Sequence, residues 1–129
     1  SALVTGEWTN SIVGGLEPCM VAGEYCPARW VRLYKLENTD GPLKAVGTLV
    51  KTGPSHWREY SYFNQGDKTT GNARFNFRQT SHSGNVIQLH DPSRNVQLEI
   101  DLDKEIVRYG EDGGSKRPLY KAWALRERL

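Results

Sequence analysis

The chain has 129 residues and a net charge of +2, with 37% of its residues hydrophobic and 25% charged. This length suits one domain with one core, and the composition excludes a chain that is disordered or collagen-like throughout. No apolar run approaches the ~20 residues of a membrane-spanning helix, and the basic excess is too mild to indicate a nucleic-acid partner. We therefore expect a single domain over residues 1–129, without a membrane span.

Nine short strands are predicted, mainly from apolar residues that alternate with polar ones. In chain order they cover residues 7–13, 29–37, 43–51, 57–63, 74–78, 85–90, 95–102, 104–109 and 119–125. The clearest is the seventh, in which Val96, Leu98 and Ile100 share one face and polar residues occupy the other. Only a strand produces this pattern, because a helix would scatter the same residues around its axis.

Turn-forming residues separate most of these strands. Gly, Pro, Asn, Asp or Ser gather at residues 38–42, 52–55, 65–68, 81–84, 91–94 and 110–114. Connections this short indicate antiparallel neighbours, and a long antiparallel meander removes its exposed edges when it closes. The sequence therefore predicts an all-β fold, an antiparallel up-and-down barrel of about eight strands, with a two-sheet β-sandwich as the alternative.

The two cysteines, Cys19 and Cys26, lie close together in the sequence, and Gly23 between them can turn the chain. A disulfide can close such a loop, whereas the spacing does not fit zinc or thioredoxin-like sites. We expect a disulfide, with two free buried thiols as the alternative, and no metal or cofactor. A disulfide indicates an oxidising compartment, and Ser1 in place of Met suggests a processed or trimmed N-terminus. The expected disulfide therefore favours a secreted or periplasmic protein.

The segment Thr5-Gly6-Glu7-Trp8-Thr9-Asn10 resembles the opening of the avidin-type biotin-binding proteins and the Gly-x-Trp signature of lipocalins and other calycins. The resemblance implies that Trp8 plugs one end of the barrel at the first strand, beneath a basic residue such as Arg126 or Arg128. It also implies that Asn10 contacts the ligand. If the barrel closes, the final strand, residues 119–125, should lie beside residues 7–13. Small bacterial inhibitors of secreted metalloproteases share this opening, a disulfide and an N-terminal arm, for which residues 1–4 would serve.

A set of aromatic residues forms the first candidate binding site. Its members are Trp30, Tyr34, Trp57, Tyr60 and Tyr62, with Tyr109 as a further aromatic. Such rings offer large contact areas with a polar tip and are favoured at binding surfaces; the alternative is that they pack the core. Tyr60 and Tyr62 are the best candidates, because their strand carries large groups on both faces.

Charged residues form two further candidates. Trp57-Arg58-Glu59 resembles the strand that bears the glutamate base in small microbial ribonucleases, and arginine and histidine could complete such a site. The residues concerned are His56, Arg58, Glu59, Arg74, Arg78, His82 and His90. Glu99, Asp101 and Asp103, with Glu105 nearby, could bind calcium. For both groups the alternative is a solvated strand face.

These observations favour a small secreted binding protein without catalytic residues. It would hold a small molecule, a glycan, as a lectin does, or a protein partner at the barrel mouth or on the aromatic face. A protease-inhibitor barrel is the first alternative. A small phosphodiester hydrolase that uses Glu59 with arginine and histidine is the second.

Overall fold

The computed structural model describes residues 20–21, 24–25, 29–36, 44–62 and 71–124. These residues form ten strands and no helix. The strands are β1 (Met20–Val21), β2 (Glu24–Tyr25), β3 (Trp30–Lys35), β4 (Ala45–Gly53), β5 (His56–Ser61), β6 (Ala73–Ser83), β7 (Val86–Asp91), β8 (Val96–Asp101), β9 (Ile106–Glu111) and β10 (Arg117–Ala124).

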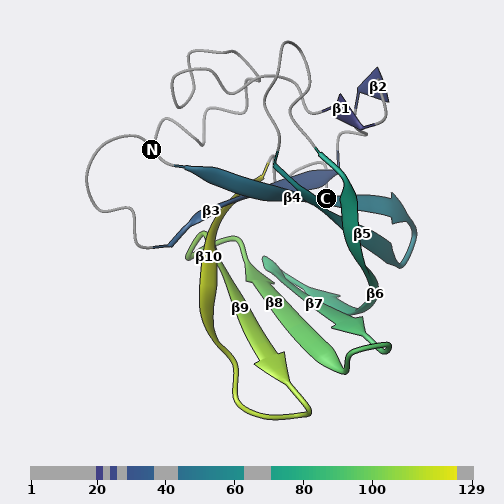
Figure 1. Cartoon of the computed structure of the whole chain (residues 1–129). Coiled ribbons are helices and arrows are strands. Elements are labelled where there is room, and N and C mark those ends of the chain that lie inside the picture. Colours follow the sequence, from purple (N-terminus) through teal and green to yellow (C-terminus); the bar gives the residue numbers. More distant parts are fainter. Residues whose placement is uncertain (1–19, 22–23, 26–28, 37–43, 63–70, 125–129) are drawn as a thin grey trace.

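Strands β3 to β10 form a closed antiparallel barrel in the order β10-β3-β4-β5-β6-β7-β8-β9 (Figure 1). Every strand pairs with its neighbour in the sequence, and β10 closes the ring against β3. The predicted up-and-down barrel is confirmed, and closure excludes the two-sheet sandwich. Eight of the nine predicted strands overlap these barrel strands, and the remaining one, residues 7–13, lies outside the described residues.

The strand that completes the barrel is not the expected one. The register of β10 with β3 runs from Tyr120 opposite Lys35 to Ala124 opposite Val31. The expectation that the final strand lies beside residues 7–13 is therefore wrong, because β3 occupies that position. Trp8, Asn10, Arg126 and Arg128 also lie outside the described residues, so the end plug remains a prediction.

The barrel interior is a continuous apolar core. On β7, Ile87 and Leu89 point inward, and on β8 the inward residues are those that the alternation predicts. The buried members are Val31, Leu33, Leu49, Trp57, Phe77, Ile87, Leu89, Val96, Leu98, Ile100, Leu102, Val107, Ala122 and Ala124. Burial of this apolar surface is the main source of stability for such a fold.

The hairpins use turn chemistry that matches their loop lengths. Gly84 (φ 60°) opens the two-residue β6–β7 turn, where the backbone of a II′ turn requires a positive φ. The β8–β9 turn contains neither Gly nor Pro, and the sequence analysis identified no turn signal there. Instead, Oδ1 of Asp101 accepts hydrogen bonds from the backbone N–H groups of Asp103 and Lys104, and Glu105 adopts a positive φ of 55°. Asp101 at the end of β8 was therefore the available signal for this turn, and the sequence analysis did not use it.

Strands β1 and β2 form a separate two-stranded sheet in which Met20 lies opposite Tyr25. Cys19 and Cys26 directly flank this pair in the sequence but lie outside the described residues. The expected disulfide between them therefore remains a prediction.

We expect thiol labelling of the unfolded, unreduced protein to find no free cysteine. Labelling after reduction should then find both Cys19 and Cys26, the only cysteines in the sequence. Two labelled cysteines before reduction would show that the thiols are free and would remove the argument for an oxidising compartment.

Candidate functional site

The longest strand, β6, has 11 residues and is shared between two neighbours that contact different halves of it. Strand β5 pairs with Ala73 to Arg78, and β7 pairs with Arg78 to Ser83. Residues 73–77 of β6 therefore have one edge paired with β5, and no described strand pairs with their other edge. The barrel wall therefore opens where β6 and β7 part.

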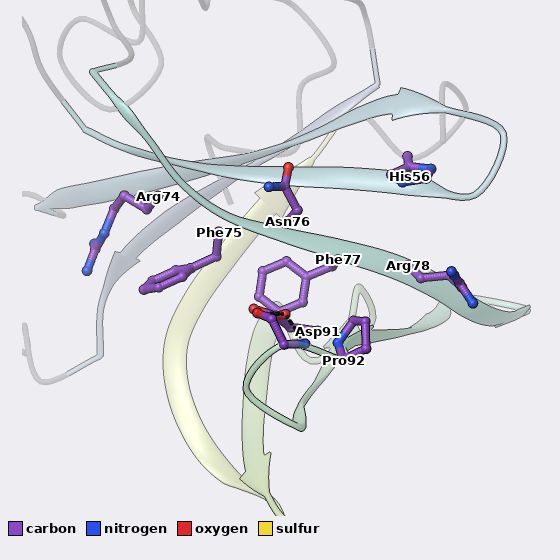
Figure 2. A pocket seen from close by; sticks show the side chains of 9 residues that line it. His56, Arg74, Phe75, Asn76, Phe77, Arg78, Asp91 and Pro92 are labelled. Atoms are coloured by element: carbon purple, nitrogen blue, oxygen red, sulfur yellow. Dashed lines mark hydrogen bonds between the residues drawn. The ribbon is translucent and has the colours of Figure 1, made fainter.

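A cleft of about 290 Å³ lies at this opening. It is lined by His56, Arg74, Phe75, Asn76, Phe77, Arg78, Asp91, Pro92 and Ser93, and we call it the β6 cleft. Figure 2 shows Phe77 pointing from β6 toward Asp91, Phe75 on the same side of the strand but directed away from Asp91 and Pro92, and Asn76 pointing to the other side. The partly buried ring of Phe75 therefore forms the apolar floor of the cleft, Phe77 (2% exposed) lies behind it in the core, and Pro92 and Ser93 of the β7–β8 turn form one wall.

That wall is held by the carboxylate of Asp91, which is 3% exposed. Oδ1 accepts hydrogen bonds from the backbone N–H (3.0 Å) and the hydroxyl (2.7 Å) of Ser93, and Oδ2 accepts one from Nε of Arg94 (2.6 Å). Burial by itself would raise the pKa of Asp91, but the hydrogen bonds from Ser93 and Arg94 outweigh it and lower the pKa. The Arg94 guanidinium also lies 3.5 Å from the ring centroid of Phe75, so the turn is tied to the floor of the cleft.

The rim of the cleft is cationic. Arg78 lies directly opposite His56 on β5 and His90 on β7. In the described part of the chain the salt bridges are Arg74 with Glu59 and Arg94 with Asp91, so no carboxylate pairs with Arg78. The β6 cleft therefore combines an apolar floor with positive charge that its surroundings leave available to a ligand.

Glu59 lies on the inward face of β5 and is 5% exposed. Its Oε2 is 3.8 Å from Nη1 of Arg74, which also lines the β6 cleft. Burial raises the pKa of Glu59, while Arg74 and Arg94 act in the opposite direction. His56, three residues earlier on the same strand, faces the other side because strand residues alternate. The structure therefore brings Glu59 and an arginine together and places His56 apart from them.

The aromatic candidates divide between two faces. Val31 and Leu33 point into the core, so Trp30, Arg32 and Tyr34 lie on the outward face of β3. A cross-strand row on this face joins Trp123, Arg32, Thr48 and Tyr60, in which Trp123 lies opposite Arg32, Arg32 opposite Thr48, and Thr48 opposite Tyr60.

This outward face is closely packed. Trp30 and Trp123 meet edge to face with ring centroids 6.2 Å apart, and the Arg32 guanidinium lies 4.9 Å from the Trp30 ring and 5.1 Å from the Tyr62 ring. Trp30, Tyr34 and Tyr60 are buried, and burial raises the pKa of Tyr34 to about 12. Arg32 and Trp123 were not among the residues predicted for this face. The available signal for Arg32 was its place as a lone arginine within the apolar sequence of β3.

Trp57 is separated from these residues. It points into the barrel core, is 0% exposed, and donates a hydrogen bond from Nε1 to Oε1 of Gln79 (2.8 Å). Tyr109 also packs partly buried against the core. The five aromatic residues predicted to bind ligand therefore do not form one surface.

The remaining charged candidates have structural partners or are exposed. His82 is exposed on β6, and Nε2 of His90 is hydrogen-bonded to Oδ1 of Asn95 (3.0 Å). Glu99 accepts a hydrogen bond from Gln88, and Asp103 accepts one from Asn85. Within the described ranges, no group of three or more His, Cys, Asp or Glu residues could hold a metal ion.

No protein-family model, curated protein or solved structure matches this chain in comparisons with known proteins. In the described part of the chain, no helix is long and apolar enough to span a membrane.

Proposed function

We propose that this protein is a non-catalytic binding protein that holds a small amphipathic anion in the β6 cleft. One observation carries the proposal: the partly buried ring of Phe75 lies at the floor of a cleft whose rim carries Arg74, Arg78 and His56, with Phe77 behind it in the core. Ligand sites are typically concave and largely apolar, with a few polar groups that fix orientation. An anion with an apolar body satisfies both parts of this cleft.

The size of the cleft favours a small molecule over the other expected partners. A volume of about 290 Å³ lies just below the usual range of small-ligand pockets, ~300–1,000 Å³. A glycan would need exposed rings for stacking, whereas Trp30, Tyr34 and Tyr60 are buried. No specific observation among the described residues supports a protease-inhibitor surface.

The hydrolase alternative depends on a histidine beside Glu59. A general acid must lie within hydrogen-bond reach of the reacting group that the base also serves. His56 lies on the opposite face of β5, and His90 is hydrogen-bonded to Asn95. The groups that act on Glu59 are Arg74, Arg94 and Tyr120, and none of them is a histidine, so we do not favour catalysis.

The proposal can be tested with 8-anilinonaphthalene-1-sulfonate, an anion with an apolar body, by isothermal titration calorimetry. We expect one equivalent to bind the native protein. Pro92→Trp should reduce the affinity at least about tenfold, because an indole at position 92 fills the cleft from its wall. Pro118→Trp is the matched control, since Pro118 is exposed on β10 and does not line the cleft. Equal affinities in the two variants, or no binding by the native protein, would refute the proposal.

A further inference from the structure

We propose that Arg74 binds the anion in the β6 cleft and that Glu59 competes with this ligand for Arg74, so that binding strengthens as the pH falls below neutral. The inference rests on the proposed function. It adds the residue that holds the ligand and the group that regulates its binding.

A β-bulge distinguishes Arg74 from the other cations of the rim. The register of β5 with β6 shifts between Glu59 and Tyr60, and Arg74 is the extra residue on β6. A bulge re-aims a side chain relative to the regular alternation of its strand. Figure 2 shows Arg74 and Phe75 on the same side of β6, and Cζ of Arg74 lies 5.3 Å from the ring centroid of Phe75. The charge of Arg74 therefore lies beside the apolar floor.

The other two cations of the rim, His56 and Arg78, follow the regular alternation. They lie directly opposite each other and are exposed. The next pair, Trp57 and Phe77, points into the core. Because strand residues alternate between faces, His56 and Arg78 lie on the outward face of the barrel. Of the three rim cations, Arg74 is therefore the one that shares the side of the floor.

Glu59 is the internal counter-ion of Arg74. Its Oε2 lies 3.8 Å from Nη1 of Arg74, and its carboxyl group is buried. The Arg74 side chain is 44% exposed, so a ligand in the cleft has access to it. Two anions that share one cation repel each other and disfavour ionisation. Ionised Glu59 therefore opposes a bound anion, and protonation of Glu59 removes this opposition.

The surroundings of Glu59 favour its protonated form. Burial raises the pKa of this carboxyl, while the positive charges of Arg74 and Arg94 act in the opposite direction. Tyr120 on β10 is also close, and burial together with the charge of Glu59 raises the pKa of its phenol. The charged residue on the inward face of β4 is Lys51. Glu59 therefore becomes protonated at a higher pH than an exposed glutamate.

The sign of the pH effect follows from this arrangement. Above the raised pKa of Glu59, its carboxylate and the ligand compete for Arg74. As the pH falls through that pKa, the carboxyl takes up a proton and the ligand meets Arg74 without a competitor. Linkage is reciprocal, so a bound anion also raises the pKa of Glu59, and binding takes up protons.

The test is calorimetry with 8-anilinonaphthalene-1-sulfonate, because its sulfonate stays ionised throughout the range studied. We expect the native protein to bind at least about threefold more tightly at about pH 5 than at about pH 7. Glu59→Gln should bind more tightly than the native protein at about pH 7 and should lose this gain. In buffers of different ionisation enthalpy, the native protein should show proton uptake on binding and Glu59→Gln should not.

Two further substitutions examine the cations. Arg74→Gln should weaken binding at least about tenfold at about pH 5 and should abolish the pH gain. Arg117→Gln is its matched control, since Arg117 is exposed on β10 and lies over Tyr109. His56→Gln separates the two rim groups, because histidine ordinarily changes charge between about pH 5 and 8. We expect the pH gain to persist in His56→Gln.

Two outcomes overturn the inference: Arg74→Gln binding like the native protein at about pH 5, or a pH gain that persists in Glu59→Gln or disappears in His56→Gln. If Glu59→Gln does not fold, Arg74→Gln and His56→Gln decide the question. When the native protein binds the sulfonate and Pro92→Trp does not, either outcome leaves the proposed function standing. If the native protein binds at neither pH, both proposals fall together.

Discussion

Trp57→Ala should lower the free energy of unfolding by about 3–5 kcal/mol, the usual cost of emptying a core aromatic site. Trp57 is 0% exposed and is among the largest fully buried side chains of the described residues. It lies opposite Phe77 on β6, so the cavity would also remove support from the floor of the β6 cleft. The substitution further leaves Oε1 of Gln79 without the indole donor.

Urea unfolding of the native protein and two variants measures this effect. Trp57→Phe keeps a ring in the core and loses the hydrogen bond, so its cost should be smaller, about 1–2 kcal/mol. Trp57 was predicted to bind ligand, so ligand binding by the same variants should also be measured. A loss below about 1 kcal/mol for Trp57→Ala, together with lost ligand binding, would contradict the core assignment.

Asp91→Asn should have the second largest effect, a loss of about 1–3 kcal/mol at neutral pH. The carboxylate is buried and accepts three hydrogen bonds that shape the β7–β8 turn. An asparagine amide has one uncharged oxygen, so it cannot accept the hydrogen bonds of both Ser93 and Arg94, which the two oxygens of the carboxylate accept. The Arg94 side chain is 32% exposed, and this exposure keeps the loss below that of breaking a fully buried ion pair.

The pH dependence of stability distinguishes this role from simple packing. The pKa of Asp91 is lower in the folded protein than its ordinary value, so the ionised carboxylate stabilises the fold above ~pH 3.9. This contribution is lost as the pH falls through the folded pKa, where the carboxylate becomes protonated. The native protein should therefore lose more stability than Asp91→Asn between neutral pH and about pH 3.

Unfolding curves at a series of pH values measure the difference. Asp103→Asn serves as the control, because Asp103 is exposed in the β8–β9 turn and does not line the β6 cleft. Its curve should keep the acid dependence of the native protein. Parallel curves for the native protein and Asp91→Asn would show that the hydrogen bonds of Asp91 do not stabilise its ionised form.

Local sequence pattern was sufficient for the barrel strands and for most turns. Alternation of apolar and polar residues located β8, because a period of two is incompatible with a helix. The turn residues at 91–94 marked the end of β7, whereas the predicted strand 74–78 was too short, because β6 continues to Ser83 through most of the predicted turn 81–84. Short connections then required antiparallel neighbours, from which closure into a barrel followed. All of these properties depend on residues close together in the chain.

The sequence pattern did not identify the strand that pairs with β10, because this pairing joins segments far apart in the chain. Residues 7–13 and β3 both have strand-like patterns, and alternation does not specify which of them β10 pairs with. Backbone hydrogen bonds are alike in any sequence, so the choice depends on how side chains from distant strands pack together. In the structure, β3 supplies this packing with Val31 and Leu33 inside the barrel and Trp30 against Trp123 outside.

The candidate site depended even more than the barrel closure on how neighbouring strands align with one another. Alternation shows that Trp57 and Glu59 share a face of their strand, and His56 and Tyr60 the other, but not which face is inside. Only the structure shows that β5 and β7 engage different halves of β6, so that the wall opens at Arg78. The β6 cleft results from this offset between strands far apart in the sequence, because an opening in a sheet is a property of pairing and no single strand encodes it.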